Sequence, residues 1–194
     1  RTLFTDWQKF EPYQIGAQRF AQGSKRLTLM NINRHKLEKT TGVDLLFYHE
    51  NHASYVLVQY KRMVEENNGG AYRYRPTDSS YRDELGRMQR LRTIFCSTNR
   101  ATTLDDYRLS TEMFYFKLCK SVTLTPLSTE PIDGMFVPLD YWEMFVKTPQ
   151  AFGTRGGLYV DSQNIGRNFS NIEFTSLIEK GWIGSRGITS LKLD

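Results

Sequence analysis

Two apolar runs joined by a short polar turn constrain the fold of this chain more than any other part of the sequence. They are residues 43–48, with the sequence VDLLFY, and residues 55–61, with the sequence YVLVQYK. Both are rich in β-branched and aromatic side chains, which favours strands buried in a sheet. The short connection between them favours a hairpin, so we expect two neighbouring antiparallel strands.

Three polar side chains interrupt these runs. Asp44 lies in the first run, and Gln59 and Lys61 lie in the second. Residues two apart on a strand point to the same face, so Gln59 and Lys61 project together and Tyr60 projects away. The partner strand of a hairpin can bring Asp44 beside them. Burying a charged group is costly unless something requires it, so one shared site is the simplest joint explanation.

The residues around these positions resemble a known family. Gly42-Val43-Asp44-Leu45, followed by Val58-Gln59-Tyr60-Lys61-Arg62, is similar to the motif of the Mrr-like restriction endonuclease branch of the PD-(D/E)xK nucleases, which carries Gln in place of the second acid. Phe10-Glu11 is similar to the Phe-Glu of that family's opening helix. The resemblance covers Phe10 to about Leu91. It implies an α/β protein with a restriction-endonuclease-like core, in which helices flank a central mixed sheet in the order αβββαβ.

The resemblance also implies a chemistry. It is that of a metal-dependent DNA endonuclease that hydrolyses phosphodiester bonds with Mg²⁺ or Mn²⁺, in restriction or antiviral defence against phage. The implied catalytic residues are Asp44, Gln59, Lys61 and Glu11. The implied metal ligands are Asp44, Gln59, the backbone carbonyl of Tyr60 and Glu11, since Mg²⁺ prefers oxygen ligands and needs only one or two carboxylates. Lys61 would position the nucleophile or stabilise charge on the phosphate. Glu38 is the second choice for the acid that Glu11 would supply.

The basic residues of the chain fit a partner that carries phosphates. The net charge is +5 and the pI is about 9.2, a mild excess that many unrelated proteins share. The predicted contacts to DNA are Arg62, Arg73, Arg75, Arg87 and Arg90. The arginines within residues 79–95 could equally form a solvated helix face, paired with acids of the same helix. Those that alternate with Tyr72 and Tyr74 could instead pack along apolar surface in a loop.

The sequence also bears on where the protein works and with what. Cys96 and Cys119 form no CxxC pair and lie near no histidine cluster, which argues against a zinc site and a disulfide framework and favours the cytoplasm. No apolar run approaches the ~20 residues of a membrane helix, so no membrane partner is expected. One active site cuts one strand. We therefore expect a homo-oligomer, or a longer parent chain, if the product is a double-strand break.

Periodic patterns predict the remaining elements. Helices are expected over residues 6–22, 79–95, 141–146 and 174–179, and further strands over 26–33 and 112–118. Residues 36–41 are expected to form a turn. Pro and Gly residues over 126–134 indicate a boundary. We therefore expect a nuclease-like core over residues 1–126 and a small C-terminal appendage, or the start of a further region, over 127–194.

Two other functions stay open from the sequence alone. A DNA-binding module of the same fold that has lost catalysis would bind DNA without cutting it, because Gln is a weaker metal ligand than an acid. A protein-interaction domain would line an interface with its aromatic residues, such as Phe114-Tyr115-Phe116 and Tyr141-Trp142. Asp44 and Lys61 could also form a plain buried ion pair between adjacent strands.

Overall fold

The computed structural model describes residues 8–9, 16–32, 36–66, 70–95, 100–120 and 132–187. Its elements in chain order are β1 (Gln8–Lys9), β2 (Ala17–Gln22), β3 (Lys25–Asn31), α1 (Lys36–Thr41), β4 (Leu45–His49), η1 (Glu50–His52), β5 (Ser54–Glu65), β6 (Tyr72–Arg73), α2 (Tyr81–Phe95), β7 (Phe114–Lys120), β8 (Gly134–Pro138), α3 (Leu139–Phe145), η2 (Pro149–Ala151) and α4 (Asn171–Glu179).

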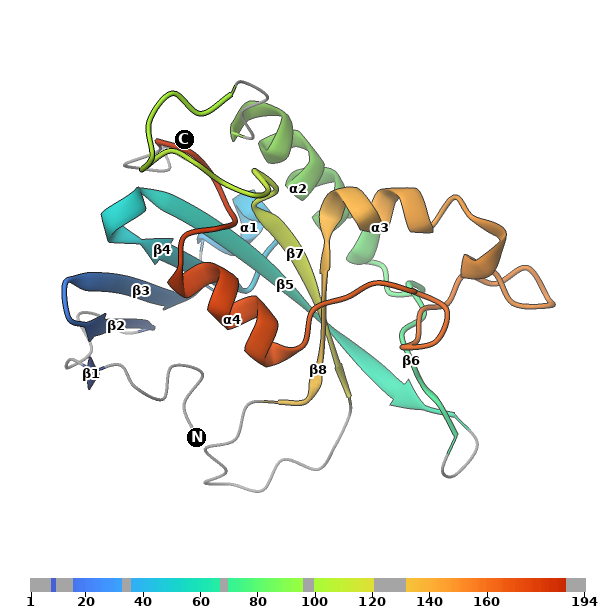
Figure 1. The fold of residues 1–194 in the computed structure, drawn as a ribbon. Helices are drawn as coiled ribbons and strands as arrows, with labels where there is room; N and C mark the ends of the chain where they lie inside the picture. Colours follow the sequence, from blue (N-terminus) through green and yellow to red (C-terminus); the bar gives the residue numbers. More distant parts are fainter. Residues whose placement is uncertain are drawn as a thin grey trace.

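The eight described strands form one mixed sheet. Seven follow the order β1-β2-β3-β4-β5-β7-β8, and β6 pairs with the end of β5 (Figure 1). Neighbouring strands are antiparallel except β5 and β7, which are parallel. Parallel neighbours need a long crossover, and α2 lies in the connection between them. The predicted class, an α/β protein with a central mixed sheet flanked by helices, is confirmed.

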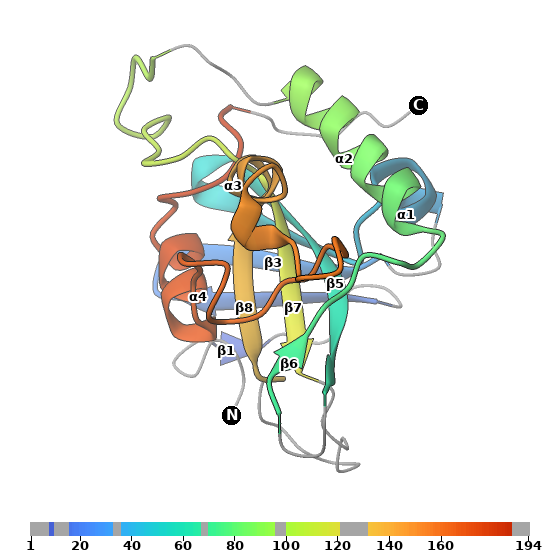
Figure 2. The same ribbon diagram turned by 90° about the vertical axis from the view of Figure 1, so that its right-hand side faces the viewer.

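Strand β5 separates two apolar cores. Tyr55, Leu57 and Met63 point to the core that includes side chains of α2 and α3, whereas Val56 and Val58 point to the core that includes α4. Figures 1 and 2 show α4 on one side of the sheet and α1 and α2 on the other. We call these two sides the α4 face and the α2 face. The strand is buried on both faces, as its nearly continuous apolar run predicts.

Aromatic side chains fill much of the core on the α2 face. Phe114, Phe116 and Trp142 are fully buried there, and Trp142 Nε1 donates a hydrogen bond to the Tyr81 hydroxyl over 2.9 Å. Tyr115 is buried on the α4 face. The alternative in which the 114–116 triplet and Trp142 line an interface is not favoured, because these rings pack inside the fold.

The chain before β3 departs from the predicted helix. Residues 17–22 form β2, which pairs with β3 along its whole length. The helix expected over residues 6–22 is therefore wrong in its described part. Alanine, glutamine and arginine in this stretch favour a helix, but that preference is weak. Pairing with β3 and burial of Phe20 and Ala21 outweigh it.

Residues 36–41 form the short helix α1, where a turn was predicted. The sequence KLEKTT has a single apolar residue, so it shows no helical period. A helix of this length is marginal by itself in water. Its packing against α2, a contact between segments far apart in the sequence, stabilises it.

The predicted boundary near residue 126 lies outside the described residues. On either side of it, β7 and β8 are hydrogen-bonded neighbours, with Phe116 opposite Val137 and Leu118 opposite Met135. Side chains from both strands share the core on the α2 face. The described parts before and after the boundary therefore belong to one sheet.

Among the described helices, none is long and apolar enough to cross a membrane.

Candidate functional site

A close contact between the start of β4 and helix α2 places Asp44. Helix α1 ends at Thr41, and Gly42 follows it with a φ of 71°. A Cβ on Gly42 would lie 2.7 Å from the carbonyl oxygen of Glu84, so the chain passes directly against the backbone of α2. Glycine tolerates both this backbone angle and this approach. The contact brings Asp44 close to the helix that carries Glu84.

The Asp44 carboxylate completes the pairing between β4 and β5. Its backbone N–H donates to Val58 O over 3.0 Å, and its backbone carbonyl accepts from Ile32 N over 2.8 Å. Its side chain accepts from the Tyr60 N–H over 2.8 Å, in the place of the backbone carbonyl that a regular ladder would use. Asp44 therefore has a structural role in addition to any chemical one.

The charges around Asp44 come from several elements. Burial raises the pKa of Asp44, and the Tyr60 N–H opposes that rise. The carboxylates of Glu38 and Glu84 raise it further, whereas the Lys61 ammonium lowers it. Asp44 thus shares one electrostatic environment with two acids and one amine.

Gln59 is almost fully buried, with 5% of its surface exposed. Its Nε2 donates to Tyr60 O over 3.3 Å. Its Oε1 is buried and accepts no hydrogen bond from the part of the chain that the structure describes. Buried polar atoms nearly always have a partner, so this oxygen is an exception among the described residues.

Two acids hold Lys61 on the α2 face. The residue is 8% exposed, and its Nζ lies 2.5 Å from Glu84 Oε2 and 3.3 Å from Asp78 Oδ1. Asp78 also accepts hydrogen bonds from the hydroxyls of Ser80 and Tyr74. Burial acts to raise the pKa of Asp78, but the Ser80 hydroxyl and the Lys61 ammonium hold it below its usual value. The amine is therefore fixed at the N-terminal end of α2.

Glu84 contacts Lys61, but no sequence pattern identified it as a site residue. From the sequence it is one of several acids that pair with arginines of the same helix. In the structure its side chain is 12% exposed and turned toward Lys61. Its position in the first turn of the helix that follows β5 is the only local signal, because its partner depends on how α2 packs on the sheet.

Asp44, Lys61 and Glu84 interact electrostatically, and Gln59 lies two residues before Lys61 on the same face of β5; we call these four residues the Asp44–Lys61 cluster. Within the described ranges, no three His, Cys, Asp or Glu side chains are grouped so that they could hold a metal ion. The predicted ligands within this cluster are the Asp44 carboxylate and the neutral oxygen of Gln59. The Tyr60 carbonyl, predicted as a further ligand, accepts a hydrogen bond from the Gln59 amide. Glu11, predicted as both ligand and catalytic acid, lies outside the described residues.

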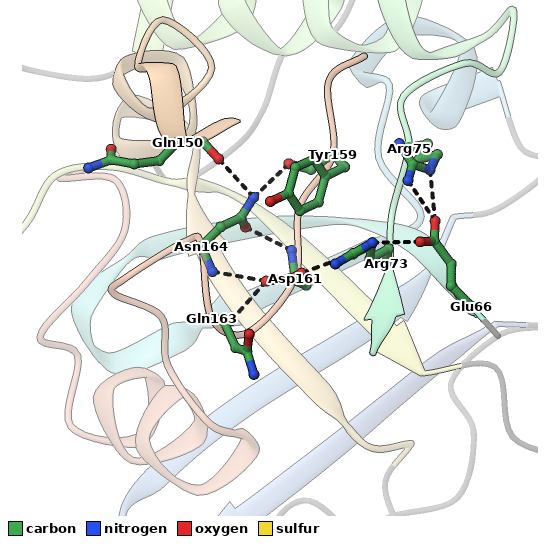
Figure 3. A network of polar contacts seen from close by, with 8 residues as sticks. All are labelled: Glu66, Arg73, Arg75, Gln150, Tyr159, Asp161, Gln163 and Asn164. Carbon is green, nitrogen blue, oxygen red and sulfur yellow. Dashed lines mark hydrogen bonds and ion pairs between the residues drawn. The ribbon is translucent and has the colours of Figure 1, made fainter. Parts of the chain in front are cut away.

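Arg73 and Arg75, two of the predicted DNA contacts, belong to a polar network within the chain (Figure 3). Arg73 pairs with Glu66 at 2.6 Å and with Asp161 at 3.1 Å, and Arg75 pairs with Glu66 at 2.8 Å. Both guanidinium groups lie over the Tyr159 ring, 4.7 and 5.7 Å from its centroid. Their positive charges are thus offset by acids of the same chain.

The other three predicted DNA contacts lie on two sides of the sheet. Arg62 is an exposed, even-numbered residue of β5, so it points to the α4 face, opposite to Lys61. Arg87 and Arg90 lie on α2, the helix that carries Glu84. Only the α2 pair is therefore on the same side of the sheet as the Asp44–Lys61 cluster.

Comparison of the chain with models of protein families, with curated proteins and with solved structures finds no match.

Proposed function

We propose that this chain is a metal-dependent DNA endonuclease of the PD-(D/E)xK type, with Asp44, Gln59 and Lys61 at its active site. The proposal rests on one observation. An acid and an amine from neighbouring strands share one electrostatic environment, and the strand of the amine also carries a buried amide oxygen that has no donor among the described residues. The motif requires such groups to converge.

The order of the elements gives further support. Apart from the short elements α1, η1 and β6 that interrupt the series, the antiparallel strands β3, β4 and β5 are followed by α2 and then by β7, which runs parallel to β5. This order corresponds to the last five elements of the αβββαβ core that the resemblance implies. A role in restriction or phage defence follows from the resemblance alone.

The residues present fit a magnesium or manganese site with few protein ligands. Asp44 contributes a carboxylate that accepts from the Tyr60 N–H, and Gln59 contributes an oxygen for which the described residues supply no donor. Both are the hard oxygen groups that Mg²⁺ prefers, and it keeps water in its other positions. When bound, the metal makes water more acidic and offsets charge on the phosphate.

The chain's own charged residues would then act on the DNA. Lys61, fixed by Glu84, presents a positive charge near Asp44 that can stabilise a phosphate oxygen. Arg87 and Arg90, on the same helix as Glu84, can contact neighbouring phosphates. We propose a homo-oligomer or a longer parent chain for double-strand cutting, and light scattering on DNA that shows only monomers would contradict it.

The close pairing of Lys61 favours one alternative, a DNA-binding module that does not cut. An ammonium 2.5 Å from Glu84 reaches a phosphate only if the pair opens. Such a module would bind DNA with an affinity that falls steeply with salt. Lys61→Met would leave that binding unchanged.

The test is incubation of supercoiled plasmid with Mg²⁺ or Mn²⁺. We expect the wild type to nick or linearise it, and Asp44→Asn and Lys61→Met to slow this by about a hundredfold or more. EDTA should abolish it. Lys120→Met is the matched control, because it removes a lysine that pairs with Asp133 near the surface.

Three outcomes separate the proposals. Loss of cutting in both site variants, but not in Lys120→Met, supports the nuclease. Salt-dependent DNA binding without cutting supports the inactive module. A wild-type chain that neither cuts nor binds DNA overturns both. Circular dichroism of each variant shows whether the fold is retained.

A further inference from the structure

Four large apolar residues are exposed at one place on the surface, where the loop before β7 lies beside the chain that follows α4 (Figure 1). They are Leu104, Tyr107, Leu109 and Trp182. The rings of Tyr107 and Trp182 meet edge to face, with their centroids 5.9 Å apart, and Tyr107 N donates to Leu104 O over 3.2 Å. We call these four residues the Trp182 patch. Exposed apolar residues that stand alone need no explanation, whereas several at one place mark an interaction site.

Hydrogen bonds fix the backbone of the patch. Leu109 N donates to Trp182 O over 2.8 Å, which joins the two segments. The buried guanidinium of Arg108 donates to the carbonyl oxygens of Asp105 and Tyr107, and to a third carbonyl in η1. The loop is therefore ordered before a partner arrives, so binding needs little further loss of conformational freedom.

Charges of both signs accompany the patch. Asp105 and Asp106 precede Tyr107 in the loop, and Lys180, an exposed residue at the end of α4, lies two residues before Trp182. A surface with acids on one of its segments and an amine on the other can complement a copy of itself related by a two-fold axis. The acids also disfavour nucleic acid as the partner here, because its phosphates would face them.

We propose that the Trp182 patch is the surface through which two copies of this chain associate, with the acids of the loop in each copy facing Lys180 of the other. Tyrosine and tryptophan are enriched at the centres of such interfaces. The choice of a second copy rests in part on the proposed function, because cutting both strands of DNA requires two active sites. The patch itself is defined without reference to that function.

The first test is sedimentation equilibrium of the full chain, without DNA or metal. The mass should rise from 22.7 kDa toward twice that value as the concentration rises through the micromolar range. Leu104→Ser should not affect folding, because the Leu104 side chain is 95% exposed. Its contacts are lost from both copies, so the dissociation constant of the dimer should rise about tenfold or more.

Val64→Ser is the matched control. Val64 is another exposed apolar residue, but it lies near the end of β5. The start of β5 is the part next to the patch, since Ser54 Oγ donates to Ile183 O. The ten residues from Ser54 to Val64 extend over about 33 Å of strand. Val64→Ser should therefore associate as the wild type does, and equal weakening by Val64→Ser and Leu104→Ser would exclude the patch as the interface.

Charge exchange tests whether the partner is a second copy. Asp105→Lys and Lys180→Glu each place like charges across the proposed two-fold axis, so each variant alone should associate about tenfold more weakly or worse. An equimolar mixture should form a heterodimer about as strong as the wild-type dimer, because every altered charge then meets an opposite one. Circular dichroism of each variant shows whether the fold is retained.

Two results overturn the proposal. One is a wild-type chain that stays monomeric through the micromolar range, which would leave the patch to a different partner. The other is a mixture of the two folded charge variants that associates no better than either alone. Because association is measured without DNA, it can fail while plasmid is still cut, and cutting can fail while the copies still associate.

Discussion

The ammonium of Lys61, on the central strand β5, lies 2.5 Å from the carboxylate of Glu84, on helix α2. Both side chains are nearly buried, with 8% and 12% exposed. Removing one partner of a buried pair leaves the other charge without compensation, which costs much more than the pair itself contributes. The contact therefore couples the helix to the sheet at the place where we propose the active site.

Glu84→Gln should lower the free energy of unfolding by about 2 kcal/mol, less than for a fully isolated pair, because Asp78 still faces the Lys61 ammonium. Lys61→Met should be destabilising as well. The double variant should lose less stability than the sum of the two single losses, since neither charge is then left without its partner. Urea unfolding followed by circular dichroism measures all three.

Lys120→Met provides the comparison for this pair. It breaks an ion pair whose side chains are 42% and 73% exposed, so the expected loss is below about 0.5 kcal/mol. If Glu84→Gln costs no more than Lys120→Met, the Lys61–Glu84 contact does not hold the helix on the sheet.

Gly42→Ala should be strongly destabilising. The added Cβ would lie 2.7 Å from Glu84 O, and a φ of 71° is strained for any residue with a side chain. We expect the free energy of unfolding to fall by at least about 2 kcal/mol, because Asp44 is displaced. Thermal unfolding gives the stability, and the plasmid assay should show reduced cutting if the proposed site is active.

Gly23→Ala separates the two causes. Gly23 also has a positive φ, of 56°, but a Cβ there meets nothing within 4 Å. The free energy of unfolding of Gly23→Ala should therefore fall only by the backbone strain, about 1 kcal/mol. Equal losses of stability in the two variants would show that the close approach of Gly42 to α2 does not affect the free energy of unfolding.

Gly86→Ala should have the opposite sign. Gly86 lies in the interior of α2, and a Cβ there also meets no atom within 4 Å. Alanine is the better helix former, so we expect a gain of about 0.5–1 kcal/mol in the free energy of unfolding. An unchanged or lower unfolding midpoint in urea would contradict this.

Local sequence patterns are enough to predict strands β4 and β5, and to predict that two polar side chains of β5 share a face. The apolar runs predict β4 and β5, and period-two alternation predicts that Gln59 and Lys61 share a face. In the structure they lie between Leu57 and Met63 on the α2 face. Such features need only neighbouring residues, so the sequence is sufficient to infer them.

Long-range packing decides the features that the sequence did not reveal. Strand β2 is made of residues with helix preference and forms because β3 offers a partner. Helix α1 depends on contact with α2. Glu84 meets Lys61 only once α2 is placed on the sheet, and Arg73 meets Asp161 through a loop far along the chain. Local periodicity in the sequence carries no information about contacts between such distant residues.

The stability of the protein should depend on pH through Glu112. This residue is 5% exposed, and its carboxylate accepts from the N–H groups of Phe114 and Asp140. Burial raises its pKa from 4.5 to about 7, against the Phe114 N–H and the Arg92 charge. Between these values the folded protein holds a proton that the unfolded chain has released. The free energy of unfolding should therefore fall by about 3 kcal/mol as pH rises through this window, and level off above it.

Glu112→Gln should remove this fall, because an amide is neutral at every pH. Urea unfolding of both proteins from about pH 5 to 8 measures it. The difference between them is the informative quantity. Burial lowers the pKa of His49 to about 4, so His49 acts in the opposite direction in part of the same window, and the subtraction cancels it. Parallel stability curves for the two proteins would exclude Glu112 as the source.

Asp161 should be the most sensitive position of the network in Figure 3. One carboxylate oxygen accepts from the backbone N–H groups of Gln163 and Asn164, over 3.0 and 2.9 Å, and the other accepts from Arg73 Nε over 3.1 Å. The residue is 3% exposed, so these donors cannot readily turn to water. Asp161→Ala leaves all three without an acceptor and should cost about 2–3 kcal/mol.

Asp161→Asn tests which half of this arrangement matters. The amide oxygen can still accept from the two backbone N–H groups, whereas the amide nitrogen faces the Arg73 guanidinium, donor against donor. Arg73 keeps its second partner, Glu66, so the loss should be only about 1 kcal/mol. Urea unfolding ranks the variants. If Asn costs as much as Ala, the ion pair to Arg73 is the dominant contribution, and the turn at Gln163 and Asn164 forms without help from the carboxylate.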